Sequence, residues 1–178
     1  MKYRNLGNSG LKVPVVCFGA WAIGGWMWGG TDEREAVRAL QHALDCGITC
    51  IDTAPAYGFG LSEQLVGQAI KGRREEVVVA TKCGLRWDQQ EGEFFFDTTD
   101  GGGRPWKIFR NLRGHSIEYE VEASLNRLGI DCIDLYQCHW PDATTPIGET
   151  MEALERLKEM GKIREYGVSN FSREQLPE

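Results

Sequence analysis

Four polar side chains lie at or just past the C-terminal ends of predicted strands, and together they could transfer a proton to a carbonyl group. They are a carboxylate, a phenol, an ammonium and an imidazole: Asp52, Tyr57, Lys82 and His139. A phenol has an ordinary pKa of about 10, and a nearby ammonium lowers that pKa by stabilising the phenolate. The carboxylate would hold the ammonium, and the imidazole would donate a hydrogen bond to the substrate oxygen or relay a proton. General acid catalysis of this kind contributes ~10²- to 10⁴-fold, whereas a hydride must come from a cofactor.

Each of these residues also has an ordinary interpretation when it is taken alone. An aspartate at a strand end often caps the next turn, a lysine there is often solvated, and a single histidine is more often structural than catalytic. Their occurrence at the same end of successive strands is what favours a shared site.

The strands that carry these residues alternate with helical patterns. Apolar runs predict five buried strands, at residues 15–19, 48–53, 77–82, 132–139 and 163–170. Apolar residues at helical spacing predict helices between them, at residues 32–47, 62–72, 117–129 and 151–161. Asp32 with Glu35 has capping-box spacing, Ser62 is a candidate cap, and Ser172 with Gln175 predicts the start of a fifth helix.

This alternation predicts a parallel sheet, because a parallel neighbour can be reached only through a crossover. An open doubly wound sheet and a (β/α)8 TIM barrel both begin in this way, so periodicity leaves the choice open. Polar residues at strand after strand favour the barrel, where active sites gather at the C-terminal ends of the strands.

Residues 1–178 are predicted to form a single partial barrel domain. Residues 1–14 read as an N-terminal hairpin that turns on glycine, and residues 15–178 supply strands one to five with their helices. The chain stops within the first turns of the fifth helix, so we expect a truncated barrel. Its open edges beside Phe18 and Val168 would allow self-association.

The connection from Cys83 to Gly114 is longer than connections in compact domains usually are. Two interpretations remain open for it. It could be a mobile lid over the substrate, or a surface excursion with a short packed aromatic segment at residues 93–97.

Composition and charge exclude several classes of function. The formal charge of −6 argues against a surface for nucleic acid or anionic lipid. The start of the chain lacks the apolar stretch of a signal peptide, and no window approaches the ~18 apolar residues of a membrane span. These features predict a cytoplasmic protein with no membrane partner.

The six cysteines lie mostly in or beside apolar runs, and we expect them to be reduced and buried. Cys83 and Cys138 flank Lys82 and His139, which leaves a reactive thiol as an alternative. The cysteine and histidine spacings match no usual zinc pattern, so no metal site is expected.

Several motifs in order give the chain its resemblance to a known family. The chain resembles the aldo-keto reductases, and its style is similar to bacterial general-stress-type members and to potassium-channel β-subunits. The motifs stand at residues 51–58, 62–63 with 67, 80–82, 124–128, 131–136, 139–142, 161–164 and 167–171.

The resemblance implies an NADP(H)-dependent oxidoreductase on a (β/α)8 barrel that reduces a small-molecule carbonyl, an aldehyde or ketone, to an alcohol. Tyr57 would be the general acid, Lys82 and Asp52 would tune it, and His139 would orient the carbonyl. Further positions follow from the same resemblance. Cofactor contacts would involve Gly19, Ala20, Trp21, Asp52, Ser169 and Asn170, and an apolar substrate pocket would be lined by Trp26, Trp28, Trp87 and Trp140.

The chain departs from the family pattern because it lacks strands six to eight, which carry much of the expected dinucleotide surface. Two alternatives to a reductase therefore stay open. One is a nucleotide-sensing regulatory subunit that acts by binding a partner, and the other is a non-catalytic half-barrel module.

Overall fold

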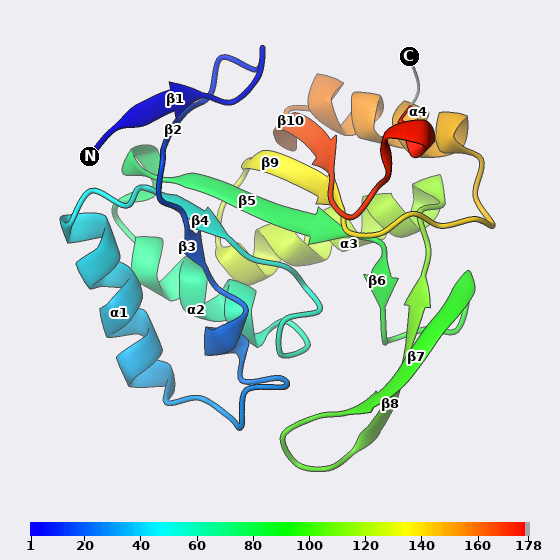
Figure 1. The fold of residues 1–178 in the computed structure, drawn as a ribbon, viewed down its shortest axis with the longest axis horizontal. Coiled ribbons are helices and arrows are strands. Elements are labelled where there is room, and N and C mark those ends of the chain that lie inside the picture. Colours follow the sequence, from blue (N-terminus) through cyan, green and yellow to red (C-terminus); the bar gives the residue numbers. More distant parts are fainter. Residues whose placement is uncertain (177–178) are drawn as a thin grey trace.

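The protein, described here from a computed structural model that covers residues 1–176, is built around a curved parallel sheet (Figure 1). The sheet has five strands in the order β3-β4-β5-β9-β10, and all four neighbouring pairs are parallel. Their bounds are β3 (Phe18–Gly19), β4 (Cys50–Asp52), β5 (Val78–Cys83), β9 (Ile133–Cys138) and β10 (Ile163–Val168).

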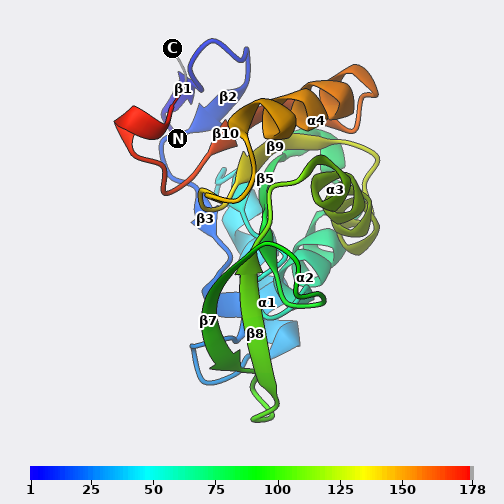
Figure 2. The ribbon, with the colours of Figure 1, turned by 90° about the vertical axis from the view of Figure 1, so that its right-hand side faces the viewer.

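Four α-helices form the crossovers and cover one face of this sheet (Figure 2). Each helix packs against the next one along the chain. They are α1 (Glu33–Asp45), α2 (Leu61–Ile70), α3 (Gly114–Leu128) and α4 (Ile147–Glu159). No helix among residues 1–176 has the length and apolar character that crossing a membrane requires.

The main hydrophobic core lies between the sheet and these helices. Ile51, Val79 and Tyr136 enter it from the strands, and each is fully buried. The helices contribute the apolar residues that recur at three- and four-residue intervals, among them Leu40, Val66, Ile117, Val121, Leu154 and Leu157. Burial of one such side chain contributes roughly 1.5–3 kcal/mol, so this layer holds the crossovers on the sheet.

The structure confirms the five predicted strands and the four predicted helices between them, with one strand much shorter than expected. Only Phe18 and Gly19 are paired in β3, whereas Val15 and Val16 are 51% and 48% exposed. The prediction of a buried strand over residues 15–19 was therefore wrong in two respects: residues 15–17 lie outside the strand, and within it Phe18 is half-buried and Gly19 is exposed. The reason is that β3 is an edge strand, with β4 as its one neighbour among the described strands.

Of the two residues predicted to cap the N-termini of α1 and α2, Asp32 is confirmed and Ser62 is not. The Asp32 carboxylate accepts hydrogen bonds from the backbone N–H groups of Arg34 and Glu35, as the spacing predicts. Ser62 does not cap α2, which begins at Leu61 after Gly60. Its hydroxyl instead bonds within the core, donating to the carbonyl oxygen of Ala20 at 2.7 Å.

The N-terminal hairpin is confirmed, and it lies apart from the parallel sheet (Figure 1). It consists of β1 (Tyr3–Asn5) and β2 (Lys12–Pro14), paired antiparallel. Short 3-10 turns occupy η1 (Ala22–Gly24), η2 (Arg74–Glu76) and η3 (Arg173–Gln175). The capping box predicted for Ser172 and Gln175 is present, but it starts the single turn η3, and the continuation of the predicted helix at residues 177–178 lies outside the described residues.

The segment between β5 and α3 is an ordered sheet rather than a plain loop. It forms β6 (Leu85–Arg86), β7 (Glu93–Thr99) and β8 (Pro105–Arg110), antiparallel in the order β6-β8-β7. This small sheet projects from the end of the parallel sheet at which β5 finishes (Figure 1). The excursion with a packed aromatic segment is confirmed in that Phe95 and Phe96 pack against a second hydrophobic cluster, but neither expectation included the three strands.

A close backbone approach between α2 and α3 leads to a stability prediction. A Cβ atom on Gly67, inside α2, would lie 2.5 Å from the carbonyl oxygen of Leu128. We expect Gly67→Ala to destabilise the fold by about 1–3 kcal/mol, because the clash outweighs the helix propensity that alanine adds. Urea denaturation measures the change.

Gly148→Ala is the matched control, since Gly148 also lies in a helix and a Cβ there meets nothing within 4 Å. That substitution should be neutral or stabilising. Equal effects of the two substitutions would contradict the close packing of α2 on α3.

Candidate active site

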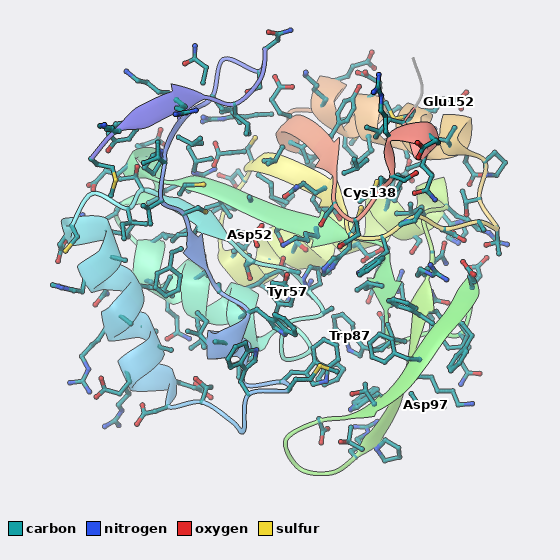
Figure 3. All side chains as sticks on the ribbon, viewed as in Figure 1. Asp52, Tyr57, Trp87, Asp97, Cys138 and Glu152 are labelled. Carbon is teal, nitrogen blue, oxygen red and sulfur yellow. The ribbon has the colours of Figure 1, made fainter. Side chains whose placement is uncertain are left out.

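Lys82 is the centre of a compact cluster at the C-terminal end of β4 and β5. Its ammonium donates to both carboxylate oxygens of Asp52, at 2.9 and 2.8 Å, and to the backbone carbonyl oxygen of Thr53 at 2.9 Å. It also lies 3.2 Å from the Tyr57 hydroxyl oxygen. Three of the four residues predicted to share a site therefore make direct contacts, and Asp52 and Tyr57 are marked in Figure 3.

Strand alternation explains why these side chains meet. Asp52 is opposite Ala80 in the parallel register, and Lys82 follows two residues later on the same face of β5. Ile51 and Thr81 point the other way, towards the helices. The face of the sheet opposite the helices therefore receives the carboxylate and the ammonium.

The Lys82 charge is buried and compensated. Its side chain is 6% exposed, whereas that of Asp52 is 37% exposed. A buried ammonium is tolerated only when its donors are satisfied, because its desolvation costs several kcal/mol. Asp52, Thr53 and Tyr57 supply the acceptors, so removal of any of them would weaken the position of Lys82.

Tyr57 is held by a backbone contact and a stacked ring. A Cβ on Gly24 would lie 2.6 Å from the Tyr57 carbonyl oxygen, and one on Gly58 would lie 2.0 Å from the Gly24 carbonyl oxygen. The loop after β3 can approach the Tyr57 turn this closely because positions 24 and 58 are both glycine. The Trp21 ring stacks on the Tyr57 ring, with centroids 5.9 Å apart and planes at 26°.

His139 comes from the end of β9 and completes the predicted set. Its ring meets the Tyr57 ring edge-on, with centroids 5.7 Å apart. Burial lowers the His139 pKa to about 3, and the positive charge of Lys82 acts in the same direction. The imidazole is therefore neutral at neutral pH, with one nitrogen able to donate a hydrogen bond and the other able to accept one.

A buried network behind the strand supports Lys82. Thr81, its neighbour in β5, donates to the fully buried Glu63 carboxylate at 2.6 Å. Arg127 of α3 donates to the other Glu63 oxygen, also at 2.6 Å. The network joins α2, β5 and α3 just behind the site.

A cavity of about 380 Å³ opens beside the Tyr57 and His139 rings. Its lining is mostly aromatic and apolar: Trp21, Trp26, Met27, Tyr57, Leu85, Phe95, Phe96, His139, Trp140, Ser169 and Asn170. A larger hollow of about 510 Å³ lies between α2 and α3 and contains none of the four clustered residues. The smaller cavity is therefore the candidate site, because Tyr57 and His139 line it.

Two of the four tryptophans predicted for a substrate pocket line this cavity, Trp26 and Trp140. Trp28 does not, because it is 57% exposed and contacts Trp21 edge-on. Trp87 does not line it either, since its ring packs edge-on against Phe59 beneath the small sheet.

Some of the residues predicted to contact the cofactor line the cavity, and others do not. Trp21, Ser169 and Asn170 line the cavity. Asn170 has a left-handed backbone (φ 62°), and its amide donates to the carbonyl oxygen of His139 at 2.9 Å. Gly19 and Ala20 do not line the cavity; Gly19 pairs with Asp52, and the Ala20 N–H donates to the Asp52 carbonyl oxygen.

The cavity lining also includes four residues that were not predicted from the sequence: Met27, Leu85, Phe95 and Phe96. The available signal was the aromatic run at residues 94–96, but strict alternation would turn Phe95 and Phe96 to opposite faces. A register shift between Phe94 and Phe96 breaks that alternation. Phe95 and Phe96 consequently both reach the cavity, and Phe94 is left 49% exposed.

Comparison with known proteins matches most of the chain to one family. The Aldo/keto reductase family matches residues 15–178. The aldo-keto reductase YhdN of Bacillus subtilis is 48% identical over 99% of this chain and 49% of its own length. An NADH-specific methylglyoxal reductase of Escherichia coli is 44% identical over the whole of this chain and 55% of its own.

A crystal structure of an aldo/keto reductase from Klebsiella pneumoniae, in complex with NADP and acetate, superposes with a TM-score of 0.69 at 34% identity. The match covers 92% of this chain and 48% of that chain. The chain thus spans about half the length of these relatives. Its five parallel strands correspond to part of a (β/α)8 barrel, and the chain belongs to the aldo/keto reductase family.

Proposed function

We propose that the protein reduces aldehydes or ketones to alcohols with NADP(H), and that Tyr57 is the general acid. The observation that carries this proposal is the contact of the Tyr57 hydroxyl with the buried Lys82 ammonium, at 3.2 Å, beside an apolar cavity. A phenol in that position has both a route to substrate and a cation to stabilise its conjugate base.

The proton transfer assigns a role to each member of the cluster. The Tyr57 hydroxyl donates its proton to the substrate oxygen, and the Lys82 ammonium stabilises the phenolate that remains. Asp52 keeps Lys82 in place through two hydrogen bonds. The neutral His139 imidazole orients the substrate oxygen by a hydrogen bond, and its low pKa prevents it from competing with Tyr57 as the acid.

The cavity residues fit a nicotinamide cofactor, which supplies hydride when it is bound. Ser169 and Asn170 place a hydroxyl and an amide on the cavity wall, and Trp21 adds a flat aromatic surface. These groups suit an amide-bearing aromatic ring. NADP is the cofactor in the Klebsiella structure, whereas the Escherichia coli relative is NADH-specific, so we propose NADP(H) and include NADH in the test.

The lining also indicates the substrate class. Phe95, Phe96 and Trp140 form an apolar wall around the polar end of the cavity. A carbonyl compound with an apolar or aromatic substituent would place its oxygen at Tyr57 and its substituent on this wall.

Tyr57→Phe should lower carbonyl reduction by about 10²-fold or more, because it removes the acidic proton. Binding of NADPH should remain, since the ring stacked by Trp21 is preserved. The test titrates the 178-residue chain with NADPH and NADH, following nicotinamide fluorescence and molar mass together, and then measures turnover. Molar mass also reports whether the chain self-associates through its edges at β3 and β10.

Tyr119→Phe is the matched control, because Tyr119 is 58% exposed on α3 and outside the cavity. Its turnover should equal that of the unchanged chain. The proposal is contradicted if the chain binds neither nucleotide, or if Tyr57→Phe retains full turnover.

The His139 ring should remain neutral until the pH falls to about 3, because burial disfavours its charged form. An NMR titration of the imidazole nitrogens measures this directly, with signals assigned through His42→Gln and His115→Gln. Lys82→Met should raise the His139 pKa, since it removes the neighbouring positive charge. A His139 pKa near its ordinary value of 6.5 would contradict the buried, neutral imidazole.

Trp140→Ala should raise KM for benzaldehyde roughly tenfold, reflecting a loss of about 1.5 kcal/mol of apolar contact. The effect on kcat should be smaller because Trp140 does not touch the Lys82 cluster. Tyr119→Ala is the control, as Tyr119 is an exposed aromatic residue of α3 outside the cavity, and it should leave KM unchanged. Steady-state kinetics with benzaldehyde and with a small polar carbonyl would separate the two effects.

A further inference from the structure

Two cysteines unrelated to the cavity meet across the first strand pair of the parallel sheet. The Cys17 and Cys50 sulfur atoms are 3.1 Å apart, and the Cys17 thiol also lies 3.1 Å from the Cys50 carbonyl oxygen. The parallel register pairs Phe18 with Ile51, so Cys17 and Cys50 are the pair of positions just before it. The two thiols therefore lie side by side on neighbouring segments of backbone.

This arrangement suits a disulfide. Neighbouring strands lie ~4.8 Å apart, and disulfides usually join residues with Cα atoms about 4.4–6.8 Å apart. Cys17 and Cys50 need no movement of the strands to be bridged.

The two cysteines differ in solvent exposure and in thiol pKa. Cys17 is exposed, whereas Cys50 is 8% exposed. The hydrogen bond from the Cys17 thiol lowers the pKa of Cys50, and the same contact raises the pKa of Cys17. The inner sulfur, Cys50, is thus the better thiolate, and a solute approaches it from the side of the exposed Cys17.

We propose that Cys17 and Cys50 form a reversible oxidation site, at which a hydroperoxide converts the two thiols to a disulfide. The Cys50 sulfur, as the thiolate that the Cys17 thiol stabilises by its hydrogen bond, attacks the terminal peroxide oxygen. The O–O bond breaks, and an alcohol, or water from hydrogen peroxide, leaves. The Cys17 sulfur then attacks the Cys50 sulfenic acid, forming the S–S bond and releasing water. The two thiol protons leave on these two products, and the two electrons lost by the sulfurs reduce the peroxide.

A second cysteine pair in the same sheet provides an internal comparison. Cys83 and Cys138 are direct register partners in β5 and β9, so their backbone spacing is also compatible with a disulfide. Each of them is only 1% exposed. The hydrogen bond with Cys138 raises the Cys83 pKa, and burial raises it further. Both pairs have a backbone spacing that suits a disulfide, but of these four cysteines only Cys17 is exposed to solvent. We therefore expect a dissolved oxidant to oxidise the Cys17–Cys50 pair and to spare Cys83–Cys138.

The disulfide would fasten the edge strand β3 to the interior of the sheet. β3 has only two paired residues, and the bridge would lie two positions before the Gly19–Asp52 pair. Oxidation should therefore stabilise the fold, because it closes a loop between positions 33 apart in the unfolded chain.

The experiment treats the 178-residue chain with hydrogen peroxide, blocks free thiols with N-ethylmaleimide, and maps tryptic peptides by mass spectrometry. We expect a linked pair of peptides, one with Cys17 and the other with Cys46 and Cys50, in which Cys46 carries the blocking group. Dithiothreitol should reverse the link. The Tm of the oxidised chain should be about 5 °C or more above that of the reduced chain.

Variants make the outcome decisive. Cys17→Ser and Cys50→Ser should each abolish the link and the rise in Tm, whereas Cys46→Ser and Cys83→Ser should retain both. The proposal is overturned if no linked peptide forms in the folded chain, if the link joins Cys46 to Cys17, or if Cys83 and Cys138 are oxidised as readily. Because the readout is the covalent state, the result is independent of carbonyl reduction.

Discussion

The buried ammonium of Lys82 is the constraint on which the rest of the site depends. A charge that is almost fully removed from water must be compensated within hydrogen-bonding distance, and Asp52, Thr53 and Tyr57 do so from one strand end and the turn beyond it. β4 and β5 must therefore be neighbours in a fixed register, and the turn must bring its phenol back over the strand. The same compensation that makes the fold tolerate Lys82 gives Tyr57 a cationic partner.

Buried polar groups between the sheet and the helices also connect the Lys82 strand to the helix layer. Glu63 joins Thr81 to Arg127, and thereby ties α2 and α3 to the strand that carries Lys82. Asp134 acts similarly further along the sheet, where its buried carboxylate receives the Arg74 guanidinium and the backbone N–H of Val79. The sheet is thus held by apolar packing and by a few paired buried charges, which fix the register more strictly than packing alone.

The sequence predicted the parts of the structure that follow periodic rules. Five strands, four crossover helices and the convergence of Asp52, Tyr57 and Lys82 all follow from apolar repeats and from polar residues at strand ends. It did not predict the small sheet, because an aromatic run between glycines carries no clear period, nor the joint orientation of Phe95 and Phe96, which depends on one register shift. Ser62 was misassigned as a cap because its hydroxyl satisfies a core carbonyl instead, and exposure of Val15 and Val16 depends on which strands neighbour β3.

The small sheet leaves and rejoins the parallel sheet at almost a single point. The Asn111 N–H donates to the Gly84 carbonyl oxygen at 3.1 Å, and everything between these residues projects outward. Leu85, Phe95 and Phe96, the part of the cavity wall that lies between these two residues, therefore belong to an insertion with adjacent ends, attached to a strand whose own register is fixed elsewhere. Its length and aromatic content can be changed by design without moving Lys82, so under the proposed function substrate preference and proton transfer can be altered separately.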